Sequence, residues 1–128
     1  MKTKHGLSEI RVSMGMFLYD IMCVVGPYEN LEKYLRWKFE DNGRMPEEWT
    51  NSNPKGLCCF KEGFVPVIWL PEKPKTTEQH GTLAHEAFHA MYHLFDWAGM
   101  KITRDTEEVM AHGIKHIVST ILEALYKK

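Results

Sequence analysis

The chain lacks an excess of charge of either sign. Its 128 residues contain 16 lysines and arginines against 17 aspartates and glutamates, which gives a formal net charge of -1 at pH 7. Nucleic acids and anionic membranes are bound by a surplus of basic side chains, so we expect neither as a partner. The apolar runs also fall far short of the roughly 20 residues that span a bilayer. We therefore predict a protein without a membrane-spanning segment.

The features of a secreted protein are also missing. The stretch Met1 to His5 is basic, but no apolar core and no small-residue cleavage site of a signal peptide follow it. Only three cysteines are present, Cys23, Cys58 and Cys59. They cannot all pair internally, and neighbours on a strand would point to opposite faces. We expect reduced thiols, at least one of them buried, and a cytoplasmic location.

Composition indicates one domain, residues 1–128. Hydrophobic residues make up 44% of the chain, which is enough for a single core, and no linker or repeat divides it. The apolar run from Phe17 to Val25 predicts a strand, and Gly-Pro then leads into a helix from about Tyr28 to Asp41. The segment from Asp41 to Gly56 is rich in Asn, Gly, Pro and Ser, as is typical of a surface loop.

Two short strand-like runs follow, from Leu57 to Phe60 and from Phe64 to Leu70. The turn between them contains Gly63, so the pair predicts a hairpin. Pro66 predicts an edge position for the second strand, because proline cannot donate to a central ladder. A peptide could bind at such an edge by strand addition. The alternative is a short strand that merely ends a small sheet.

The most informative stretch is the pentapeptide HEAFH, residues 85–89. Side chains four apart on a helix lie one above the other, so His85 and His89 can bind one metal ion. Glu86 lies beside them and can accept a proton from a zinc-bound water, whose pKa the metal lowers towards neutrality. This pattern is typical of zinc-dependent hydrolysis. The alternative is a helix whose histidines merely border a core.

The surroundings of the motif predict an amphipathic helix. Thr76 and Gln79 have the spacing of a capping box at its start, and Gly99 would end it. Apolar residues recur at helical spacing between them, namely Leu83, Ala84, Ala87, Phe88, Met91, Leu94 and Phe95. The periodicity therefore places both histidines and the glutamate on one continuous helix.

A catalytic zinc site needs a third protein ligand and an open position. His93 lies two helical turns beyond His85, about 12 Å along the axis, and is a poor candidate. Phe95 stands where the extended metzincin pattern has its third histidine, so that class is rejected. The acidic pair Glu107 and Glu108 is the better source, because it opens a second apolar-periodic helix.

An HEAFH helix followed by a second helix that bears glutamate resembles the gluzincin metallopeptidases. The short chain is similar to their small single-domain forms, the minigluzincins, and to small metallopeptidases encoded by phages and bacteria. The resemblance implies that a glutamate of the second helix is the third zinc ligand. Many gluzincins have a small residue three positions after that ligand; Glu108 with Ala111 fits, whereas Glu107 with Met110 does not. We favour Glu108, with Glu107 in reserve; alternatively, Asp105 and Glu108 form a capping box and bind no metal.

The second helix departs from the thermolysin-like pattern at His112, where those gluzincins have an aspartate. This leaves the support of the zinc-binding histidines open. His112 and His116 are themselves four apart, but no positioned glutamate accompanies them, and we expect both along the helix edge. His112, His116, Tyr92 and Tyr126 are all candidates for donating a hydrogen bond to a tetrahedral intermediate.

These observations predict a small α+β, zincin-like domain in which a short mixed or antiparallel sheet packs on the HExxH helix and the glutamate helix. The resemblance implies a zinc endopeptidase, with zinc held by His85, His89 and Glu108 and with Glu86 as general base. The partner would be a peptide or protein bound along Phe64 to Leu70, in the host cytoplasm if the chain is phage-encoded. The alternative is a non-catalytic binding or regulatory protein that keeps the fold and the metal. Glu86 counts against it, because a metal scaffold alone needs no carboxylate there.

Overall fold

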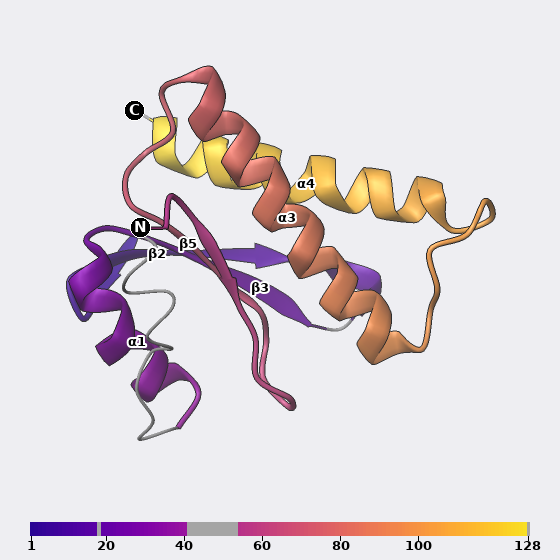
Figure 1. Ribbon diagram of the computed structural model, residues 1–128, viewed down its shortest axis with the longest axis horizontal. Coiled ribbons are helices and arrows are strands. Elements are labelled where there is room, and N and C mark those ends of the chain that lie inside the picture. Colours follow the sequence, from indigo (N-terminus) through magenta and orange to yellow (C-terminus); the bar gives the residue numbers. More distant parts are fainter. Residues whose placement is uncertain (18, 41–53, 128) are drawn as a thin grey trace.

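The computed structural model describes residues 1–17, 19–40 and 54–127, and confirms the α+β class (Figure 1). The strands are β1 (Lys2–Lys4), β2 (Leu7–Ser13), β3 (Asp20–Val25), β4 (Leu57–Cys59) and β5 (Val67–Leu70). The α-helices are α1 (Leu31–Lys38), α3 (Thr77–Ala98) and α4 (Glu107–Tyr126), and short 3-10 helices span Gly15–Phe17 and Tyr28–Asn30. Among the described residues, no helix combines the length and apolar character needed to cross a bilayer.

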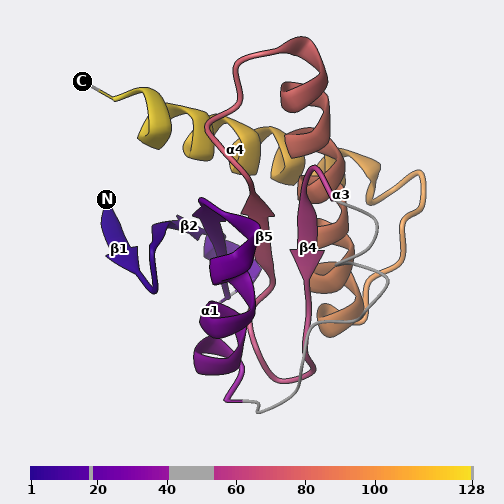
Figure 2. The same cartoon turned by 60° about the vertical axis from the view of Figure 1, so that its left-hand side comes forward.

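The strands form one mixed sheet in the order β1-β2-β3-β5-β4. Strands β3 and β5 run parallel, with Cys23 opposite Ile68, and the other neighbouring pairs are antiparallel. Parallel neighbours need a crossover connection, and the chain between β3 and β5 contains α1. Helix α1 therefore lies on one face of the sheet, while α3 and α4 cover the other face (Figures 1 and 2).

Successive side chains of a strand point to opposite faces of the sheet, so the apolar core has one part on each face. The sheet side chains facing α3 and α4 include Ile10, Val12, Ile21, Cys23, Ile68 and Leu70. Those facing α1 include Leu7, Met22, Val24, Cys59, Val67 and Trp69. Neighbouring Cys58 and Cys59 pack on opposite faces, as predicted, and all three cysteines are free thiols.

The predicted signals at both ends of α3 are confirmed. The Thr76 hydroxyl accepts a hydrogen bond from the Gln79 amide at 3.1 Å, and the Gln79 side chain accepts one from the Thr76 amide at 3.1 Å. This capping box satisfies amides that lack partners inside the helix. At the other end Gly99 has φ +73°, the left-handed conformation that favours glycine. Local sequence thus fixes the limits of the helix that carries the HEAFH motif.

Helix α4 crosses α3 at a point of close approach. Gly113 lies so near Met91 that a Cβ added to Gly113 would be 2.5 Å from the Met91 Sδ atom. Leu83, Leu94 and Ile117 of the two helices are almost completely buried in the same core as Met91. The absence of a side chain at Gly113 therefore allows the two helices to pack together.

The N-terminal third departs from the sequence prediction. Strands β1 and β2 were not expected, and the strand predicted over 17–25 begins at Asp20, because Gly15–Phe17 form a 3-10 helix. The helix predicted over 28–41 starts with a 3-10 turn, and α1 proper covers Leu31–Lys38. Most of the loop predicted over 41–56 lies outside the described residues.

The predicted hairpin is present, but its edge assignment is wrong. Strands β4 and β5 are antiparallel neighbours, and Gly63 in the connection has φ +86°. Strand β5 is central, because it pairs with β3 on its other side. Pro66 is tolerated there because it precedes the first ladder residue, and its carbonyl accepts a hydrogen bond from the Met22 amide at 3.1 Å. Of the strands that the structure describes, β4 is the one at this edge.

Candidate metal centre

The predicted metal-binding motif forms a compact group on α3. One potential ligand atom each from His85, Glu86 and His89 lies within 4.8 Å of the others. The Nε2 atoms of the two histidines are 3.2 Å apart. Two nitrogens bound to one tetrahedral zinc at about 2.0–2.1 Å would be separated by about 3.3 Å. The histidine pair therefore has the geometry of a zinc chelate.

Glu86 is the buried member of the group. It is only 7% exposed, whereas both histidines reach the surface. Burial raises the pKa of the Glu86 carboxyl, and the positive charge that His85 and His89 can carry opposes this rise. A carboxylate whose pKa is raised from its ordinary value towards neutrality is better suited to accept a proton at physiological pH. The environment of Glu86 thus favours general-base chemistry.

The chain that leads into β4 packs directly on Glu86. A Cβ added to Gly56 would lie 2.6 Å from the Thr82 Cγ2 atom and 3.5 Å from the Glu86 Cγ atom. Beside this contact is a cavity of about 440 Å³, which His85 and Glu86 help to line. Its rim carries an ion pair between Lys55 and Glu78, with the charged atoms 2.7 Å apart. His85 and Glu86 of the candidate metal-binding group therefore face a hollow large enough for part of a ligand.

The structure does not bring the predicted third ligand to this group. The Glu108 side chain is 79% exposed, and its carboxylate lies 3.3 Å from the His112 Nε2 atom, one turn along α4. Within the described part of the chain, neither Glu107 nor Glu108 belongs to the cluster around His85. The alternative capping box is absent, because α4 starts after Thr106 without a side-chain cap. Glu108 as a zinc ligand stays a prediction.

The other candidate side chains lie apart from the motif or on its exposed flank. His116 contacts the Ser13 carbonyl through Nε2 at 2.8 Å, and the Tyr126 hydroxyl donates to the Pro74 carbonyl. These contacts tie α4 to β2 and to the chain before α3. Tyr92 is 51% exposed on α3 and its ring lies beside Phe88. Of these residues, only Tyr92 shares the helix of the metal-binding group.

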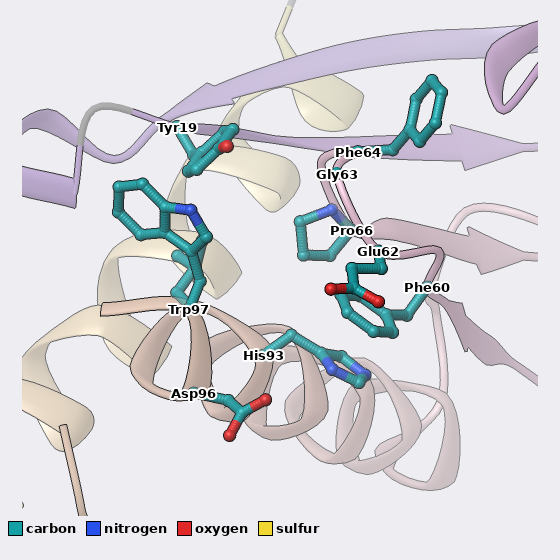
Figure 3. A pocket seen from close by; sticks show the side chains of 10 residues that line it. Tyr19, Phe60, Glu62, Gly63, Phe64, Pro66, His93, Asp96 and Trp97 are labelled. Atoms are coloured by element: carbon teal, nitrogen blue, oxygen red, sulfur yellow. The ribbon is translucent and has the colours of Figure 1, made fainter. Parts of the chain in front are cut away.

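His93 was considered from the sequence only as a poor metal ligand, and its contact with Phe60 was not predicted. Its ring stacks on Phe60, with centroids 3.9 Å apart and an angle of 6° between the planes. Burial and the nearby His89 lower the pKa of His93, while Asp96 opposes this effect. His93 also lines a second cavity of about 460 Å³, between α3 and the β4-β5 hairpin (Figure 3). Because His89 and His93 are four residues apart, they lie on the same face of the helix. The stacking partner Phe60 comes from another element, so local sequence could not predict it.

The chain matches no protein-family model, no curated protein and no solved structure. The resemblance to gluzincins therefore rests on the sequence motif, and the structure supports only the grouping of His85, Glu86 and His89.

Proposed function

We propose that the protein is a zinc-dependent peptidase in which His85 and His89 bind the metal and Glu86 acts as general base. The observation that carries this proposal is the 3.2 Å separation of the two Nε2 atoms beside a buried carboxylate. Zinc supplies Lewis-acid chemistry, which polarises the scissile carbonyl and makes water a better nucleophile. Glu108, with Glu107 in reserve, is proposed as the third ligand.

In this proposal the histidines and Glu86 have separate roles. The histidine pair fixes the position of the metal on a capped helix, so the site is supported by a rigid element. Glu86 accepts the proton of the attacking water and passes it to the leaving nitrogen. Gly56 packs on α3 beside Thr82 and Glu86, so the chain before β4 limits the space open to the Glu86 side chain. Among the described residues, Glu86 is the only buried charged side chain. Its burial limits the contact of the carboxylate with bulk water.

The substrate is proposed to be a peptide in an extended conformation. The binding strand expected from the sequence was Phe64 to Leu70, but β5 has partners on both sides. Among the described strands, β4 of the same hairpin pairs only with β5, and the chain around it packs against α3. A peptide could therefore pair with β4 through main-chain hydrogen bonds. This would place its backbone alongside the HEAFH helix.

The first test is the zinc content of untagged protein, measured by elemental analysis. One zinc per chain is expected in the wild type, with loss in His89→Ala and weaker binding in Glu108→Ala. Glu107→Ala tests the reserve ligand. His80→Ala is the matched control, because His80 lies on the same helix but bonds to the Thr76 carbonyl. Absence of zinc from the reconstituted wild type would overturn the proposal.

The second test separates catalysis from metal binding. Glu86→Gln keeps the shape of the side chain and removes its basicity, so it should retain zinc and lower kcat/KM by about 100-fold or more. Hydrolysis would be followed with a peptide library and mass spectrometry. Undiminished biological activity of Glu86→Gln would favour a binding or regulatory protein that keeps the metal site.

A further inference from the structure

The second cavity has aromatic walls. Tyr19 and Trp97 meet edge to face on one side, with centroids 4.3 Å apart and an angle of 83° between the planes. Phe60 and Phe64 come from the hairpin on the other side (Figure 3). Trp97 is 53% exposed and Phe60 is 45% exposed, so much of this aromatic surface faces water. Large exposed aromatic rings around one cavity are typical of a binding site.

Acidic side chains accompany these rings. Glu62 lies on the turn of the hairpin, and its carboxylate is seen in front of the Phe60 ring in Figure 3. Asp96 lines the cavity from α3. Within the described part of the chain, neither carboxylate forms an ion pair with a lysine or an arginine. The cavity therefore combines apolar rings with two carboxylates that form no ion pair within the described residues.

This combination fits a cation on an apolar stem. A guanidinium or ammonium group is attracted to the face of an aromatic ring, and carboxylates nearby add to the attraction. The Phe64 ring already receives such a group, because the Lys61 Nζ atom lies 5.2 Å from its centroid. The rings of Tyr19 and Trp97 are thus the part of the cavity left for the cation of a ligand.

We propose that the cavity lined by Tyr19, Phe60, Glu62 and Trp97 binds an arginine or lysine side chain of the substrate peptide. That the bound peptide is also cleaved rests on the proposed function, whereas the preference of the cavity for a basic side chain does not. His93 and Trp97 lie four and eight residues beyond His89, about 6 and 12 Å along the helix axis. An extended peptide advances about 3.4 Å per residue, so the basic residue would lie about two to four positions from the cleaved bond.

The test uses three acetylated pentapeptides of alanine that carry arginine, citrulline or norleucine at the central position. Citrulline keeps the shape of arginine without its charge, and norleucine keeps only an apolar stem. Affinities are measured with Glu86→Gln protein, so that hydrolysis plays no part. We expect the arginine peptide to bind about fivefold more tightly than the citrulline peptide and to shift the indole NMR signal of Trp97. Equal affinity for these two peptides, or tighter binding of the norleucine peptide, would overturn the inference.

Variants of the cavity sharpen this test. Glu62→Gln should weaken binding of the arginine peptide about threefold and leave the citrulline peptide unchanged. Glu123→Gln makes the same charge change on an exposed part of α4 and should affect neither peptide. Trp97→Leu should remove most of the preference for arginine, and Trp97→Phe should keep part of it. Loss of arginine binding in Glu123→Gln to the same extent as in Glu62→Gln would show a general charge effect and contradict the assignment.

The two proposals fail in different ways. A preference for arginine in the Glu86→Gln protein, together with a wild type that cleaves no peptide, would support the cavity and overturn the peptidase. Cleavage of arginine and citrulline peptides with equal kcat/KM would support the peptidase and overturn the cavity.

Discussion

The position of Glu86 depends on a glycine that is distant in sequence. Gly56 approaches α3 so closely that a Cβ there would lie 2.6 Å from the Thr82 Cγ2 atom. We expect Gly56→Ala to lower the free energy of unfolding by about 1–2 kcal/mol, because the overlap must be relieved by a shift of the chain or the helix. Denaturant unfolding would measure this, and hydrolysis should fall as Glu86 moves.

Thr82→Ser provides the control for this substitution. It removes the Cγ2 methyl group but keeps the hydroxyl that donates to the Glu78 carbonyl at 3.1 Å. The combined variant with Gly56→Ala should therefore recover most of the lost stability. Equal destabilisation by Gly56→Ala in both backgrounds would show that Thr82 is not the side chain that is displaced.

The cysteines are expected to be unreactive in the folded protein. Burial raises the pKa of Cys23 to about 12 and is the main cause of the rise to about 12 at Cys59, while Cys58 is also raised well above its ordinary value. At pH 8 a thiol with a pKa of about 12 is ionised in about one molecule in ten thousand. Iodoacetamide should thus label the native protein slowly and all three cysteines quickly in denaturant, as mass spectrometry would show. Fast stoichiometric labelling of the native chain would contradict the burial of these thiols.

At the scale of elements, the crossing of α3 and α4 offers a matched pair of glycines. A Cβ at Gly113 would overlap the buried Met91 side chain, whereas a Cβ at Gly81 would meet nothing within 4 Å. Both positions are helical, so replacement with alanine brings the same gain in helix propensity, about 1 kcal/mol. We expect Gly81→Ala to stabilise the protein, and Gly113→Ala to be at least about 1 kcal/mol less stable than Gly81→Ala in urea unfolding. Equal stability of the two variants would contradict close packing at this crossing.

The elements that were predicted correctly from the sequence are those determined by interactions between residues close together in the chain. Helix α3 has a capping box, a continuous apolar period and a terminal glycine, and the HEAFH motif lies within a single turn of it. Both features depend on residues a few positions apart. The histidine pair and Glu86 were therefore predictable, even though the chain that covers Glu86 was not.

The elements that sequence missed depend on distant partners. Strand β1 is exposed throughout, so it carries no hydrophobic period. In β2, Leu7 and Ile10 point to opposite faces, and Glu9 on the α1 side is accepted because the Tyr34 hydroxyl donates to it. The edge assignment of Phe64 to Leu70 failed for the same reason, since pairing with β3 is not encoded near Pro66. A third metal ligand, which we propose comes from α4, would likewise lie beyond the reach of local pattern.

For the whole molecule, the buried thiols predict a loss of stability at alkaline pH. The ordinary pKa of 9.0 rises to about 12 for Cys23 in the folded state. Above pH 9 the unfolded chain therefore releases a proton that the folded chain retains, so unfolding becomes more favourable as pH rises towards 12. Each such thiol should lower the free energy of unfolding by about 1.4 kcal/mol per pH unit in this range.

Urea unfolding at several pH values between 7 and 11 would measure this slope. Cys23→Ala is the control, since removal of one buried thiol should reduce the slope above pH 9 while leaving the flat region at lower pH. An identical slope in this variant would show that other groups cause the alkaline loss.

The order of the elements along the chain has a consequence for synthesis on the ribosome. All five described strands are complete by Leu70, whereas α3 and α4 follow from Thr77 onwards. In the folded protein these helices cover the sheet face that carries Ile10, Ile21 and Ile68, so a sheet formed before they emerge would expose this face to water. An apolar face of this kind is prone to aggregate. The helices that carry the HEAFH motif and its candidate partner Glu108 thus also bury the apolar face of the sheet.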